Sequence, residues 1–219
     1  MNRRVLTLVL QIFFWTGIAA QDPHFSQLYS SLYYSDPSSV SRISNPVAGL
    51  NYRNQWPGIE NAFVTYGAYY FHPVLSAQSS IGLSLMHDVQ GNGVISKTHI
   101  SGIYTYSVQI SEELQLAAGV QASFVSRKTD PDKLTFETDF TSGGSYSQNI
   151  EEFKTQFADF SLGFSAYIRE NLTTGIALHH LTTPNESNAP GKSAELNYRG
   201  VVYMIGNVNI VKVINKTFH

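Results

Sequence analysis

The chain has 219 residues and a net charge of −2, with 14% charged and 13% aromatic side chains. This length suits one domain, and the net charge gives no basic field for nucleic-acid binding. The chain contains no cysteine, so we expect neither disulfides nor a lipid-modified cysteine at the start of the mature protein.

The first residues, MNRRVLTLVLQIFFWTGIAA, have the three-part pattern of a secretory signal. Two arginines precede the apolar stretch 5–18, and two alanines follow it. We therefore expect a signal peptide over residues 1–20, cleaved before Gln21, and export of the mature chain. The alternative is an uncleaved membrane anchor, but a helical span needs about 20 apolar residues.

Further along the chain, apolar and polar residues alternate with the period of a β-strand. In ISGIYTYSVQI, residues 100–110, one face is apolar and the other is Ser, Thr and Gln, with Ile103 as the exception. A short Ser-Glu-Glu turn leads into ELQLAAGVQASFVSR, residues 113–127, which predicts a hairpin. The expected strands cover residues 47–54, 62–71, 80–88, 100–110, 113–127, 158–168, 172–178 and 198–213.

Strand length separates two classes of all-β protein. Strands of soluble proteins average about 5–6 residues, whereas a tilted strand that crosses an outer membrane needs about 9–11. Several expected strands exceed that length, their second face is small and polar, and aromatics lie near their ends, among them Tyr69, Tyr70, Phe71, Tyr104 and Phe124. We therefore predict an all-β fold, an outer-membrane antiparallel β-barrel with about eight hairpin-connected strands in this chain. A secreted, soluble β-sandwich is the alternative.

The stretch GLNYRNQWPGI, residues 49–59, combines aromatic, amide and basic side chains before a Trp-Pro-Gly break. Alternation places Asn51, Arg53 and Gln55 toward a lumen and Tyr52 and Trp56 toward lipid, where amphipathic rings are favoured at headgroup level. We interpret the stretch as a strand end at the membrane interface, with a partner-binding patch as the alternative.

No residue pattern indicates catalysis or metal binding. His179 and His180 are adjacent on an expected strand, so they should point to opposite faces at a polar strand end. The acidic loop TDPDKLTFETDF, residues 129–140, is more typical of a turn than of a calcium site. Nucleophile-elbow and phosphate-loop motifs are absent from the sequence. We expect no enzyme activity, cofactor or metal; a barrel-embedded lipase or deacylase is the enzymatic alternative.

Six stretches of the sequence, taken together and in order, resemble the PorP/SprF family. They are QDPHFSQLY at 21–29, LNYRNQWPGI at 50–59, FVTYGAYY at 63–70, ISGIYTYSV at 100–108, GVQASFVSRKTDPDKLTF at 119–136 and HHLTTPNES at 179–187. The family resemblance singles out Asp22, Pro23, Phe25, Ser26, Gln27, Tyr52, Arg53, Gln55, Trp56, Lys133, Leu134, Phe136, His180 and Pro184. It implies an outer-membrane β-barrel associated with type IX secretion and gliding motility.

The expected organisation has three parts: a signal peptide at 1–20, a periplasmic or barrel-plugging segment at 21–46, and a barrel domain at 47–219. Two features depart from the family. Its usual Asn-Pro-Ala-aromatic-small-Gly stretch corresponds here to Asp36-Pro37-Ser38-Ser39-Val40-Ser41, and the chain is shorter than is usual. We therefore expect a small barrel or a shortened, truncated member. An open sheet edge in lipid would need a partner.

The resemblance implies a noncatalytic accessory role in the bacterial outer membrane. The expected partners are outer-membrane lipid, proteins of the type IX secretion and gliding machinery, and large secreted adhesin cargo, with no nucleic acid. One alternative is a small-solute outer-membrane channel, although side chains fill a barrel of about eight strands. The other is the secreted soluble β-sandwich as a binding protein.

Overall fold

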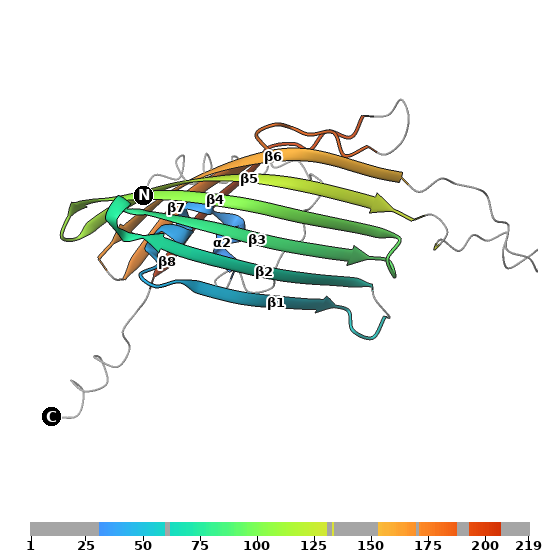
Figure 1. Cartoon of the computed structure of the whole chain (residues 1–219), viewed down its shortest axis with the longest axis horizontal. Coiled ribbons are helices and arrows are strands. Elements are labelled where there is room, and N and C mark those ends of the chain that lie inside the picture. The colour runs from blue at the N-terminus through green and yellow to red at the C-terminus, as the bar shows by residue number, and fades with distance from the viewer. Residues whose placement is uncertain are drawn as a thin grey trace, which may run out of the picture.

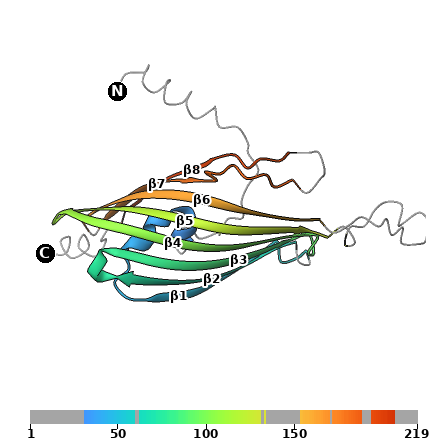
Figure 2. The ribbon, with the colours of Figure 1, turned by 45° about the horizontal axis from the view of Figure 1, so that its top comes forward.

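The structure, a computed structural model, describes residues 31–59, 62–130, 133, 153–169, 171–187 and 193–206. Eight antiparallel strands form one sheet in chain order. They are β1 (Val47–Gln55), β2 (Phe63–Val74), β3 (Ser79–Gln90), β4 (Ile95–Ser111), β5 (Leu114–Thr129), β6 (Phe153–Ile168), β7 (Leu172–His179) and β8 (Arg199–Gly206). The sheet curls into a half barrel (Figures 1 and 2). The predicted all-β meander is confirmed, and the β-sandwich alternative is wrong because the described strands form one sheet.

The two ends of the sheet differ in their connections. Tight turns join β2 to β3, β4 to β5 and β6 to β7, and we call this the short-turn end. The opposite, long-loop end holds the connections β1–β2, β3–β4, β5–β6 and β7–β8, of which the last two are the longest. Short turns at one end and long loops at the other are typical of outer-membrane barrels.

Strands β4, β5 and β6 extend further toward the long-loop end than the sequence pattern predicted. Lys97 pairs with Arg127, and Lys128 pairs with Lys154, so the ladder continues where both faces have become polar. Alternation of apolar and polar residues stops there, although the backbone hydrogen bonds do not. At the chain ends, the expected signal peptide at 1–20 and the expected continuation of the last strand over 207–213 lie outside the described residues.

The outer face of the sheet carries an apolar band that stops abruptly toward the long-loop end. On β5, Leu116, Val120 and Phe124 are 40%, 47% and 47% exposed, and the next residue on that face is Ser126. Phe124 pairs with Ile100, where the outward apolar series of β4 begins before running to Ile110. Ten residue steps on a strand tilted by about 40° rise about 25 Å, the height of the apolar band on outer-membrane barrels.

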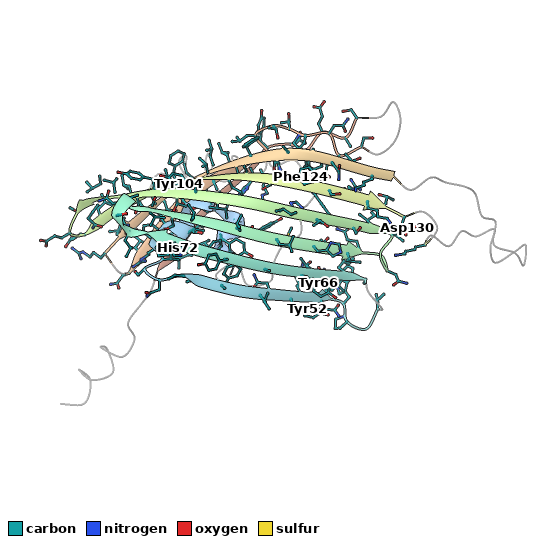
Figure 3. The ribbon with its side chains drawn as sticks, viewed as in Figure 1. Tyr52, Tyr66, His72, Tyr104, Phe124 and Asp130 are labelled. Atoms are coloured by element: carbon teal, nitrogen blue, oxygen red, sulfur yellow. The ribbon has the colours of Figure 1, made fainter. Side chains whose placement is uncertain are left out.

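Aromatic and histidine rings mark both ends of this band. At the long-loop end the rings of Tyr52 and Tyr66 lie 5.4 Å apart on the outer face. Near the short-turn end the Tyr70 hydroxyl lies 3.2 Å from Nδ1 of the exposed His72. Figure 3 shows Tyr66 and His72 toward opposite ends of β2. Such amphipathic rings suit the two interfaces of a membrane.

Two short helices, α2 (Leu32–Ser35) and the 3₁₀ helix η2 (Pro37–Arg42), lie against the concave face of the sheet (Figures 1 and 2). We call residues 31–42 the inner segment. Tyr33 and Val40 form a buried apolar cluster with Phe71 of β2 and Ile103 of β4. This contact explains why Ile103 interrupts the polar face in the sequence. None of the described helices is long and apolar enough to cross a membrane.

The outer edges of β1 and β8 pair with no strand in the described part of the chain. Apolar side chains on these two strands are unusually exposed, at 86% for Leu50 and 80% for Val202. Unpaired backbone groups cost several kcal/mol each in hydrocarbon. Each of these edges therefore requires a hydrogen-bonding partner when the sheet is in a membrane.

Val120→Arg places a charge in the middle of the apolar band and should reduce the free energy of unfolding in phospholipid vesicles by about 2–4 kcal/mol. The control is Gln156→Arg, on the outer face of β6 beyond the band, which should cost about 0–1 kcal/mol. Denaturant titration of the vesicle-inserted protein measures both. Equal costs would show that the band does not face lipid.

Candidate functional site

The inner segment is anchored at the junction between its two helices. Asp36 precedes Pro37, the first residue of η2, and its Oδ1 accepts a hydrogen bond from the Ser38 backbone N–H at 2.8 Å. An aspartate N-cap followed by proline is a strong start signal for a helix, because both residues favour the required backbone conformation. The turn at Asp36-Pro37-Ser38 is therefore encoded locally.

The same carboxyl group also binds the wall of the sheet. Asp36 has no exposed surface, and its Oδ2 accepts hydrogen bonds of 2.7 Å from the Ser165 hydroxyl on β6 and the Tyr203 hydroxyl on β8. The Ser38 hydroxyl donates as well, at 2.7 Å to Oδ1. Four donors thus surround one buried carboxyl group and satisfy its hydrogen-bonding capacity inside the protein. Asp36 connects the inner segment to β6 and β8.

Two glycines allow this close approach. A Cβ atom on Gly163 of β6 would collide with Asp36 Oδ1 and lie 3.0 Å from Pro37 Cδ. A Cβ atom on Gly119 of β5 would collide with the backbone of Pro37 and Ser38. Glycine within a strand often marks such a backbone approach. Gly102 of β4, by contrast, has open space around its Cβ position.

Further contacts secure the inner segment along its length. The Asn51 amide donates to the Tyr33 hydroxyl at 3.2 Å, and the Arg42 guanidinium lies 5.3 Å above the Tyr167 ring, within cation–π range. Burial raises the pKa of the Tyr33 hydroxyl above its usual value, and the hydrogen bond with Asn51 opposes this rise. Tyr33 therefore stays neutral at physiological pH and acts as a packing and hydrogen-bonding group.

Toward the long-loop end, the concave face is covered by the chain that follows β7. We call residues 181–187 the β7–β8 loop segment. Its Glu186 reaches across the concave face to form ion pairs with Lys97 of β4 and, at 3.5 Å, with Arg127 of β5. The Lys97 and Glu186 side chains are 10% and 15% exposed, so this pair is largely shielded from water. Opposite charges from three distant parts of the sequence thus meet inside the curl.

The two adjacent histidines both lie inside, which corrects the expectation that they point to opposite faces. Strand β7 ends at His179, and His180 has a left-handed backbone with a φ of 61°. That turn brings both rings to the interior, where they are 3% and 8% exposed and their centroids are 6.4 Å apart. His180 Nδ1 pairs with Asp159 Oδ2 at 2.8 Å. The alternation rule failed here because the strand had already ended.

The family-motif residues that the structure describes all lie toward the long-loop end. Tyr52, Arg53, Gln55 and Trp56 form the last part of β1 and the residue after it. Lys133 follows β5, and its ammonium lies 3.7 Å from Asp130 Oδ2 and 3.5 Å from the Gly93 carbonyl oxygen. His180 and Pro184 are buried at the start of the β7–β8 connection. The motif residues that fall outside the described residues are Asp22, Pro23, Phe25, Ser26, Gln27, Leu134 and Phe136.

Sequence reasoning missed the residues that join the inner segment and the loop to the sheet. Asp36-Pro37 was noticed only as a departure from the family pattern, although it carries a recognisable capping signal. Ser165 and Tyr203 were hidden among many similar residues, and nothing in the sequence pairs Glu186 with Lys97. These contacts join positions far apart in the sequence, which a single sequence does not reveal.

A polar recess lies on the concave face at the short-turn end. Its volume is about 470 Å³, and serine and glutamine side chains with Arg42 supply most of its polar lining. Among the described residues, no group of three His, Cys, Asp or Glu side chains could hold a metal ion. The concave face offers hydrogen bonding and packing to other parts of the chain.

A curled antiparallel meander with an apolar outer band and a polar concave face defines an integral membrane protein of the β-barrel class. The chain belongs to the family described as type IX secretion system membrane protein PorP/SprF, which matches residues 17–218. The match covers nearly the whole chain, so the resemblance in the six sequence stretches is confirmed. No curated protein matches the chain.

Asp36→Ala should lower the free energy of unfolding by about 2 kcal/mol or more, because buried hydroxyls on Ser165 and Tyr203 lose their acceptor. Glu113→Ala is the matched control: its carboxylate pairs with Arg169 at the exposed short-turn end and should cost about 0–1 kcal/mol. Denaturant unfolding in detergent micelles, followed by tryptophan fluorescence, compares them. Equal costs would mean that Asp36 does not anchor the inner segment.

Proposed function

We propose that this protein is a noncatalytic accessory component in the bacterial outer membrane, supporting type IX secretion or gliding by helping export, or retain at the surface, large adhesin-type cargo. The observation that carries this proposal is the family match across residues 17–218. A type IX secretion component acts on other proteins, so its partners would be the secretion and gliding machinery and its cargo, together with the lipid around the outer band.

The contents of the concave face support an accessory over a channel. A channel needs a continuous polar lumen wide enough for water. Here the inner segment lies against one part of the concave face, and the β7–β8 loop segment lies against the part toward the long-loop end. We propose that the inner segment acts as a plug, as part of the expected N-terminal unit 21–46. The Asp36 hydrogen bonds to β6 and β8 would hold it in place.

The long-loop end is the candidate surface for partner proteins. The described family-motif residues gather there, and Trp56 is 56% exposed next to the end of β1. In outer-membrane barrels the longer loops face outward from the cell and the short turns face the periplasm. This orientation would place the motif residues on the side from which exported cargo leaves.

Deletion of the gene in the native host should reduce secretion of cargo that carries a C-terminal sorting domain and impair surface spreading, and the wild-type protein should fractionate with the outer membrane. Complementation with wild type should restore both phenotypes, and the Glu113→Ala chain should restore them equally well. Unchanged secretion of every cargo tested would contradict the accessory role.

The channel alternative makes a separate prediction in planar lipid bilayers. The wild-type protein should pass no steady ion current above that of protein-free bilayers, because both halves of the concave face are occupied. A known porin, reconstituted from the same detergent, serves as the positive control. Steady current from the wild-type chain would favour a small-solute channel.

A further inference from the structure

His179, the last residue of β7, contacts the inner segment and lies two residues before the β7–β8 loop segment. His179 Nε2 lies 2.9 Å from the Ser35 carbonyl oxygen of the inner segment, and Nδ1 lies 3.0 Å from the Ser161 hydroxyl of β6. A carbonyl oxygen only accepts, so Nε2 carries the proton and donates, and in the neutral ring Nδ1 accepts from Ser161. The ring therefore bridges the inner segment and the sheet.

The next residue, His180, leads into the loop segment and fixes its direction. His180 binds Asp159 of β6, and the Thr182 hydroxyl donates to the same carboxylate at 3.2 Å. The Leu181 backbone N–H donates to the Phe160 carbonyl oxygen at 3.1 Å, so the segment continues along the free edge of β6. Figure 2 shows the chain after β7 running beside β6. Near the end of the segment, Glu186 forms its ion pairs with Lys97 and Arg127.

From these contacts we propose that the inner segment and the β7–β8 loop segment form one coupled unit, joined at His179 and His180. Displacement of the inner segment, by a partner acting at the short-turn end, would loosen the loop at the long-loop end. The two positive-φ residues at His180 and Thr183 support this reading, because such backbone conformations persist only while surrounding contacts hold them. The coupling goes beyond the proposed function and holds whatever the cargo is.

The first arm of the test displaces the inner segment and observes the loop. Gly163→Ala forces Asp36 and Pro37 away from β6, whereas the control Gly102→Ala adds a methyl group in open space. Amide hydrogen exchange of residues 181–187, measured by mass spectrometry in micelles, should rise about fivefold or more in Gly163→Ala. It should not change in Gly102→Ala, and β4 amides should keep their protection in both.

The second arm runs in the opposite direction, since coupling between two sites is reciprocal. Glu186→Gln weakens the hold of the loop on Lys97 and Arg127, and exchange of residues 32–42 should rise. The matched control is Glu195→Gln, in the same connection, whose exposed carboxylate binds the hydroxyl of Ser193. This control should leave the inner segment unchanged.

The third arm removes the joint. His179→Phe keeps a ring of similar shape but loses both hydrogen bonds, and in this background Gly163→Ala should no longer change loop exchange. The proposal fails if Gly163→Ala raises exchange in residues 32–42 but not in 181–187, or if the two remain coupled without His179. Should Gly163→Ala not fold, Ser165→Ala gives a milder displacement and is judged by the same outcomes. The test needs no secretion assay, so its failure would not be confused with failure of the proposed function.

Discussion

A carboxyl group with no exposed surface has to find hydrogen-bond donors, and Asp36 finds them both in its own segment and on the strands of the sheet. Ser38 belongs to its own helix turn, whereas Ser165 and Tyr203 belong to β6 and β8. Losing this arrangement would leave several buried polar groups unpaired at once, which is costly in a low-dielectric interior. The curl of the sheet, the glycines of β5 and β6 and the position of the inner segment are all consistent with this one requirement.

The outer face follows the opposite requirement. Lipid offers no hydrogen bonds, so apolar side chains face outward and polar residues face the concave side. The buried polar set shows the result: Ser101, Thr105 and Ser123 all lie on the inner face of β4 and β5. A soluble protein would bury the apolar face instead. In this chain the apolar face is outside and the polar face is inside. Hydrogen bonds and ion pairs hold the interior together more than apolar packing does.

Polar interiors of this kind have a consequence for communication. The hydrogen bonds of His179 to Ser35 and Ser161, and the ion pairs of Glu186, are each broken by small displacements. In a core of interlocked apolar side chains, the contacts are spread over many residues, so no single pair of residues would connect two parts of the chain. Here the path from the inner segment to the loop runs through two adjacent residues, which makes it unusually easy to interrupt.

The sequence by itself determined the elements and their faces. Alternation in residues 100–110 sets which side chains face lipid, strand length separates a membrane sheet from a sandwich, and Asp36-Pro37 encodes a local cap. Only the tertiary structure decided what fills the curl. Ile103 breaks the alternation because it packs against Val40 and Phe71 on the concave side. His180 points inward because β7 ends one residue earlier. Alternation is a local backbone property, whereas these contacts bring together residues far apart in the chain.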